Sequence, residues 1–265
     1  MIDMNAIDEI FESYNLAIQK KFEEKMHSVR NQEDYSLILK EARNEWEKSV
    51  IGGKVPEKIF SEVSFENLIE IFERAAVICD EFIPRSLADR IACEVEINDI
   101  AALAKYSDEI EVRIAAIGML GLSGDVSCSD ILIDLMYEEG EYADLIAEKA
   151  RKALVDIGRE ASAYLEKRIS GIEKPEGSDF HMIIALIEMA SDKKSDATYS
   201  ILRNAFITTG DKALAARCLA DYGDGRAVTL LRGYLDRNRG NTDKDTILEI
   251  QGAILNLGGS LDGLE

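Results

Sequence analysis

The sequence is poor in the residues that break a chain, cross-link it or bind metals. Its 265 residues include only three prolines, two histidines, four cysteines and one tryptophan. Each proline falls where a helical pattern breaks, as expected for a residue that lacks an amide hydrogen; they are Pro56, Pro84 and Pro175. Alternating runs of Val, Ile and Thr are also absent. We therefore expect essentially no β-sheet and an all-α fold.

Long apolar segments are missing as well. No apolar run reaches the roughly 18 residues that a membrane span requires. The first residues lead directly into an amphipathic pattern, without the charged and apolar regions of a secretion signal. The cysteines show no paired spacing and each lies in an apolar helical pattern, where a thiol acts as a small hydrophobe; they are Cys79, Cys93, Cys128 and Cys218. We expect a cytoplasmic protein without a membrane partner.

Basic residues are scarce relative to acidic ones. The chain has 31 Lys and Arg against 51 Asp and Glu, a net charge of −20. The imbalance is concentrated in residues 51–150, which hold 22 acids and 8 bases, whereas residues 151–265 hold 18 and 16. Such a middle third repels phosphate backbones, so we expect no nucleic-acid partner. It would attract a basic protein surface. The alternative is that the acids only keep the chain in solution.

The sequence has no recognisable catalytic or metal-binding constellation. His27 and His181 are far apart and neither belongs to a metal-ligand spacing. No nucleophile elbow or phosphate-binding loop occurs, and Gly223-Asp224-Gly225 is not preceded by a strand. We expect no cofactor and no bound metal, and we interpret the chain as a non-enzyme.

A small residue recurs at the end of successive apolar, alanine-containing stretches. The intervals are 37, 33, 32 and 35 residues, enough for two helices with short turns. Glycine suits such sites because a helix C-cap commonly needs a positive φ. A repeating helix pair cannot bury its apolar face alone and stacks on its neighbours. The pattern predicts an α-α superhelix over residues 54–258, clearest from about residue 95. The recurring residues are Gly121, Gly158, Ser191, Gly223 and Gly258.

Two segments carry a resemblance to a known family. Residues 111–125 and 219–231 are similar to HEAT-like repeats of the short type named after phycobilisome lyases, and the resemblance covers roughly residues 95–258. It implies that Asp125 and Asp224 cap second helices. The repeats ending at Gly158 and Ser191 depart from the pattern, because they lack the Val-Arg pair. The positions that the repeat assigns to structure are Val112, Arg113, Ala116, Gly121, Asp125, Gly158, Gly223, Asp224 and Arg226. The alternative is a set of antiparallel helices without solenoid stacking.

The two ends of the chain differ from the repeat. Residues 1–53 read as a long helical hairpin that lacks the alanine and glycine signature. Terminal units of solenoids commonly differ from the internal repeats, so we interpret this hairpin as an N-terminal cap. Residues 259–265 contain two further glycines, so we expect a loose tail there.

One surface pattern stands out as a candidate binding site. Asp130, Asp134 and Glu138 recur at four-residue steps, which places three carboxylates on one helical face opposite apolar residues. By the resemblance, this second helix would line the concave side of the superhelix. The three carboxylates would then form a docking strip for Lys or Arg. The alternative is a solvated face, and a metal site is disfavoured because the carboxylates spread over ~12 Å.

Three hypotheses about function remain open at this point. The first is a non-enzymatic scaffold or adaptor that binds a basic protein or peptide through an acidic groove. The second is an enzyme or accessory of HEAT-like type, such as a chromophore lyase or a glycosylase. For the glycosylase the acidic middle third has the wrong sign. The third is an acidic inhibitor or immunity protein that mimics nucleic acid. The sequence predicts no oligomeric state.

Overall fold

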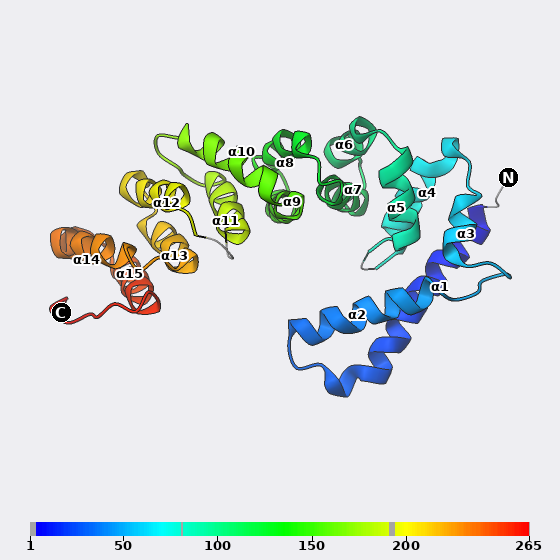
Figure 1. Ribbon diagram of the computed structural model, residues 1–265, viewed down its shortest axis with the longest axis horizontal. Helices are drawn as coiled ribbons and strands as arrows, with labels where there is room; N and C mark the ends of the chain where they lie inside the picture. The colour runs from blue at the N-terminus through cyan, green and yellow to red at the C-terminus, as the bar shows by residue number, and fades with distance from the viewer. Residues whose placement is uncertain (1–3, 81, 191–193, 265) are drawn as a thin grey trace. The chain divides into compact units, whose positions relative to one another are not determined.

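The computed structural model describes residues 4–80, 82–190 and 194–264 (Figure 1). Over these ranges the chain forms fifteen α-helices joined by turns and short 3₁₀ segments, and no strand beyond one isolated bridge between Ile51 and Lys54. The prediction of an all-α fold is confirmed. None of the described helices is long and apolar enough to cross a membrane. Ser191, one of the predicted repeat positions, lies outside the described residues.

The chain divides into two compact units, Met1–Ser123 and Gly124–Glu265. The division predicted at residue 53 differs from this one, because the N-terminal hairpin packs within the first unit. Seven helices make up this N-terminal unit in the described residues: α1 (Met4–Lys25), α2 (Gln32–Trp46), α3 (Pro56–Ser61), α4 (Leu68–Ile78), α5 (Arg85–Glu94), α6 (Ile97–Tyr106) and α7 (Ile110–Leu122).

The α1–α2 hairpin is held by aromatic pairs at two levels. The Phe22 and Tyr35 rings stack with centroids 4.6 Å apart, and Tyr14 meets Trp46 edge to face at 4.9 Å. The first half of α1 buries Ile7 and Phe11 where the helix packs on α4. These contacts join the hairpin to the rest of the N-terminal unit.

Helix α7 is the platform on which α4 and α6 both pack. The α6–α7 pairing is close, and each helix contributes a fully buried alanine to the core, Ala104 and Ala116. Small side chains permit short distances between helix axes. Arg113 donates from Nε to the carbonyl of Ala104 at 3.0 Å, which satisfies one backbone acceptor near the end of α6.

The C-terminal unit contains eight helices in the described residues. Helices α9, α11, α13 and α15 pack one against the next, and α8, α12 and α14 contact α9, α13 and α15 in turn. Helix α10 bridges, since it contacts both α11 and α12. The helices are α8 (Ser129–Met136), α9 (Ala143–Ile157), α10 (Arg159–Ser170), α11 (Asp179–Met189), α12 (Asp196–Thr208), α13 (Lys212–Tyr222), α14 (Ala227–Asn238) and α15 (Lys244–Asn256).

Glycines and aspartates mark the turns of this unit. Gly158 ends α9 with φ 87° and Gly223 ends α13 with φ 71°, conformations that L side chains rarely adopt. The Asp125 carboxylate accepts from the amide of Ser127 at 2.8 Å, at the start of η3 (Val126–Cys128), which leads into α8. Asp224 accepts in the same way from the amide of Arg226 at 3.0 Å, just before α14.

The prediction that Gly121 closes its helix is wrong, because the closing glycine stands three residues later. Gly121 is buried inside α7, which continues to Leu122, and the positive φ of 65° belongs to Gly124 instead. Gly121 itself is buried, whereas Leu122, the last helical residue, is 68% exposed. Val112 and Ala116 lie on the buried face of the same helix.

Arg226 connects two neighbouring helix pairs. Its guanidinium lies 2.7 Å from a carboxylate oxygen of Asp196 and 2.7 Å from one of Asp224. Its Cζ atom also lies 4.2 Å from the ring centroid of Tyr199. The turn before α14 is thereby tied to the first turn of α12, a structural use of the side chain.

The C-terminal segment is packed, which corrects the expectation of a loose tail. Gly258 adopts φ 78°, and the amide of Gly259 donates to the carbonyl of Ile254 at 2.9 Å, the bond that closes a Schellman turn. Arg232 of α14 donates to the carbonyls of Ser260 and Asp262. Leu264 is buried. The two glycines close the turn, and an apolar anchor then holds the segment that follows.

Candidate functional site

The acidic strip predicted on α8 is only partly formed. Asp130 and Asp134 are exposed on this helix, but α8 ends at Met136, so Glu138 lies beyond it. The expectation that all three carboxylates share one helical face is wrong for Glu138. The C-cap residue Tyr137 already departs from helical geometry, with φ −103° and ψ 5°.

The strip also has partners within the chain. The Tyr164 hydroxyl of α10 donates a hydrogen bond to Asp130. This bond raises the pKa of Tyr164, and burial raises it further by a smaller amount. Asp134 and Glu138 also have interaction partners within the chain. Nearby, the Tyr137 hydroxyl donates to Asp179 at 2.5 Å, and burial raises its pKa. These carboxylates are engaged in contacts within the molecule before any partner arrives.

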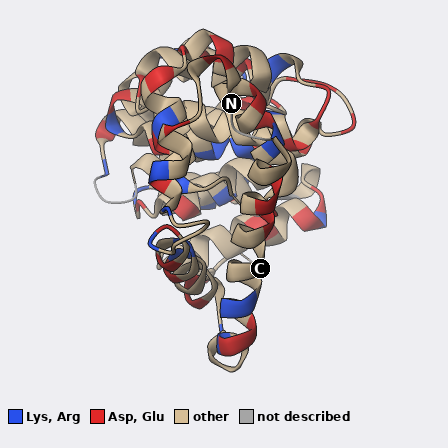
Figure 2. Cartoon of the chain, turned by 90° about the vertical axis from the view of Figure 1, so that its right-hand side faces the viewer, with Lys and Arg blue, Asp and Glu red and all other residues tan. Residues whose placement is uncertain are grey.

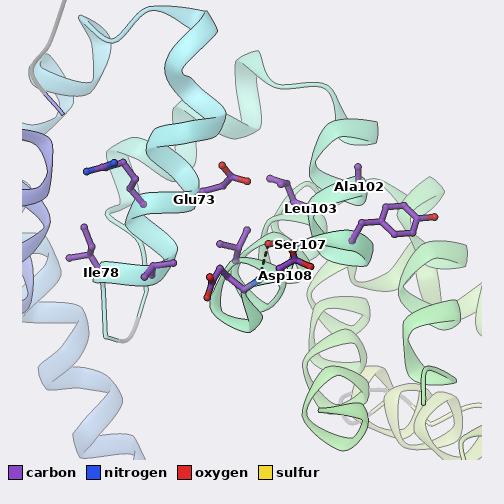
Figure 3. A pocket seen from close by; sticks show the side chains of 11 residues that line it. Glu73, Ile78, Ala102, Leu103, Ser107 and Asp108 are labelled. Atoms are coloured by element: carbon purple, nitrogen blue, oxygen red, sulfur yellow. Dashed lines mark hydrogen bonds between the residues drawn. The ribbon is translucent and has the colours of Figure 1, made fainter. Parts of the chain in front are cut away.

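A more open site lies in the N-terminal unit. A cleft of about 770 Å³ runs between α4 and α6, above α7 (Figure 3). This volume lies within the ~300–1,000 Å³ that is usual for binding clefts. In Figure 3, Glu73 of α4 and Leu103 of α6 project towards each other from opposite sides of the cleft. Ser107 and Asp108 lie at the turn between α6 and α7.

The walls of the cleft are apolar. Val77 at the end of α4 is 52% exposed and Tyr106 at the end of α6 is 79% exposed. Ile78 and Leu103 are half-buried, and Val112 of α7 is buried between the walls. Apolar side chains left accessible in a concave surface favour binding of an apolar group.

The rim of the cleft is acidic. Glu73, Asp108 and Glu109 line it, and the single cationic lining residue is Arg74. Arg74 is neutralised by Asp8 of α1, with Nε 2.9 Å from Oδ1 and Nη2 2.5 Å from Oδ2. This two-pronged hydrogen bond raises the pKa of Arg74. The cleft therefore presents three carboxylates without a competing free cation among its lining residues.

The turn that carries two of these carboxylates is locally ordered. The Ser107 hydroxyl accepts from the amide of Glu109 at 3.3 Å, drawn as a dashed line in Figure 3. Glu109 is the N-cap residue of α7. Carboxylates here also offset the positive end of the α7 dipole. Over the described helices as a whole, acidic residues are widely spread with basic ones among them (Figure 2). The cleft has three acidic lining residues and one basic lining residue.

Two other hollows are less suited to a partner. A cleft of about 590 Å³ between α2 and α5 is lined mainly by charged groups that are already paired. There Arg90 bonds Glu94 at 2.9 Å, and Glu47 accepts from the Ser86 amide at 3.1 Å. A third hollow, between α13 and α15, measures only about 230 Å³. The α4–α6 cleft alone combines room, apolar walls and charge of one sign among these three.

The described residues offer little catalytic chemistry at the cleft. They include no group of three or more His, Cys, Asp or Glu side chains that could hold a metal ion. His181 lies on α11, in the C-terminal unit, where burial lowers its pKa. His27 lies on the exposed 3₁₀ turn after α1.

Comparison with protein-family models, with curated proteins and with solved structures finds no match for this chain. The HEAT-like resemblance therefore stays a prediction from the residues alone.

Sequence analysis missed the residues that form this cleft. Glu73, Leu103 and Asp108 lie on three different segments and share no spacing. Two signals were available. The cleft falls inside the acidic middle third of the chain, and Val77 and Tyr106 are apolar residues near the ends of α4 and α6, where a polar residue would suit solvent better.

Proposed function

We propose that this protein is a non-enzymatic helical-repeat scaffold or adaptor of HEAT-like type, which binds a protein or peptide with a basic surface in the cytoplasm. Support for the α-α superhelix comes from the C-terminal unit, where α9, α11, α13 and α15 pack in succession and glycines end α9 and α13. Repeats that contact mainly their neighbours are typical of solenoids.

The observation that carries the binding function is the α4–α6 cleft, with its apolar walls and acidic rim. An apolar side chain of a partner would leave water against Val77, Leu103 and Tyr106. Lys or Arg beside it would meet Glu73, Asp108 and Glu109. Burial supplies most of the affinity in such interfaces, while complementary charge speeds encounter and selects the partner.

The same observation distinguishes this function from the two alternatives. The charged groups of the cleft are carboxylates and an arginine held by another carboxylate, a set that attracts cations rather than an acid and base poised for proton transfer. A protein that mimics nucleic acid would bind through an acidic surface as a whole. Its binding would not depend on the apolar walls.

A site-specific crosslink would test the proposed function. We would place the photoreactive residue p-benzoylphenylalanine at Leu103 of the full chain and, as a control, at Leu248, an exposed leucine of α15 in the C-terminal unit. A basic protein should crosslink from position 103 and not from 248. Binding of that purified protein should then be lost in Leu103→Lys and kept in Leu248→Lys. A partner that binds both variants equally would refute the cleft as the binding site.

A further inference from the structure

We propose that the cleft takes a single amphipathic α-helix of the partner, with about two turns inside the cleft, which lies on α7 between α4 and α6. This inference rests on the proposed function and specifies what occupies the site. It follows from the layout of three helices. Helices α4 and α6 both pack on α7, whereas the space between them is open as the cleft.

The dimensions of the walls suit one helix. Helix α4 has 11 residues and α6 has 10. The cleft is lined only by residues 73–78 of α4 and 102–106 of α6, so at ~1.5 Å per residue its walls are about 8–9 Å long and hold up to about two turns of a bound helix. A helix in this place would need the spacing of about 8–10 Å to each wall that is usual for packed helices. It would complete a layer of which α4 and α6 form the two sides.

The secondary structure and the lining residues of the cleft favour a helical ligand over an extended or polyproline peptide. A common way to bind an extended peptide is to add it as a strand to a sheet edge, and the described part of the chain has no sheet to extend. A polyproline segment binds to grooves lined with several aromatic rings. This cleft offers only Tyr106. A helix satisfies its own backbone groups and needs from its site only side-chain packing and complementary charge.

The lining residues also specify a pattern in the ligand helix. Apolar residues at positions i, i+3 or i+4, and i+7 would face Val77, Leu103 and α7. Lys or Arg on either side of this stripe would meet Glu73 on one wall and Asp108 and Glu109 at the α6–α7 turn. Asp8 is part of this arrangement, since it neutralises the guanidinium that would otherwise repel a cationic ligand.

Three model peptides test the form of the ligand. The first is an end-blocked, fluorescein-labelled 15-residue peptide of Leu and Lys with leucines at helical spacing. The second has the same composition with Leu and Lys alternating, and the third is the first with a central proline. Titration with the full chain, followed by fluorescence anisotropy, should show at least tenfold tighter binding of the helical peptide. Its circular dichroism should gain helix on binding.

Variants show whether that binding occurs in the cleft. Leu103→Lys should weaken binding of the helical peptide at least tenfold, while Leu103→Met and Leu248→Lys should leave it within twofold. Neutralising Glu73, Asp108 and Glu109 together should weaken binding and flatten its salt dependence. A matched triple variant at the exposed Glu12, Glu139 and Glu141 carries the same change in charge and should do neither.

The outcomes separate this inference from the function on which it rests. If the alternating or proline peptide binds as tightly as the helical one, and Leu103→Lys abolishes that binding, the cleft binds peptides but not as helices. The inference then fails and the proposed function stands. If the helical peptide binds equally well to Leu103→Lys, its site lies elsewhere and the inference fails. The crosslinking result then decides the proposed function independently.

Discussion

Replacing Leu264 by alanine should show how firmly the C-terminal segment is held. Leu264 is 3% exposed, so nearly all of its side chain contributes burial free energy. Full burial of a leucine stabilises by about 1.5–3 kcal/mol, and Leu→Ala changes in cores cost about 2–5 kcal/mol. A segment near a chain end relaxes more easily than a core, so we expect the low end, about 2 kcal/mol. That corresponds to about a 30-fold change in an opening equilibrium.

Hydrogen exchange would measure this effect where it occurs. Amides of α14 and α15 should exchange up to about 30-fold faster in Leu264→Ala, because Arg232 and the buried leucine hold the segment against α14 and the end of α15. Leu255→Ala is the matched control, since that side chain is on α15 and 54% exposed. It should change stability by no more than about 0.5 kcal/mol. Equal exchange in the two variants would mean that the tail is loose after all.

Three further predictions concern the cleft, the core of α7 and the thiols. Asp8→Asn leaves the positive charge of Arg74 unpaired in the cleft and should weaken binding of the helical Leu/Lys peptide about fivefold. This corresponds to ~1 kcal/mol of repulsion between Arg74 and a peptide lysine at ~7 Å in a partly screened site. Ala116→Leu should destabilise by ~1–3 kcal/mol through overpacking, whereas Gly118→Ala, with open space around its added Cβ, should stabilise by up to ~1 kcal/mol. At pH 8 a thiol reagent should label exposed Cys93 rapidly and leave Cys79 unmodified, because burial raises the pKa of Cys79 to about 12. The free energy of unfolding should also fall by up to ~1.4 kcal/mol per pH unit above pH 9, because the Cys79 thiol loses its proton in the unfolded chain and keeps it in the folded one.

Each of these has a measurement and a control. Peptide affinity of Asp8→Asn is compared with Glu12→Gln, an exposed site on the same helix with the same change in charge. Equal affinities would show that Asp8 does not shape the field of the cleft. Urea unfolding ranks Ala116→Leu and Gly118→Ala, and the reasoning fails if their order is reversed. For the pH dependence, Cys79→Ala should reduce the loss of stability between pH 9 and 11.

Local signals in the sequence were sufficient to predict the helical elements. The stripe of Ile7, Phe11, Tyr14 and Ile18 is buried in α1 at the expected helical spacing. Asp125 and Asp224 stand before helical segments and accept amide hydrogen bonds, because capping depends only on residues two or three positions away. Gly158 and Gly223 end helices for a similarly local reason.

Features that depend on packing between distant segments were not predicted. Gly121 and Gly124 are equally good candidates for a helix end in the sequence, and it is Gly124 that adopts the positive φ. The glycines after α15 suggested a loose tail, because nothing near Leu264 in the sequence shows that it is buried. The cleft likewise depends on packing between distant segments. It exists because α4 and α6 pack on α7 without filling the space between them, and no spacing of residues encodes that gap.

The succession of contacts from α9 to α15 has a consequence for how the C-terminal unit acquires its structure. Each of these helices packs on the next, so most of its stabilising contacts are made with segments nearby in the chain. Contacts of short sequence separation form with little loss of chain entropy, and folding is then fast and spreads from one formed pair to its neighbour. Damage should be equally local. A strained turn at Gly158 would slow the joining of α9 to α10 and leave the α13–α15 pairing free to form first.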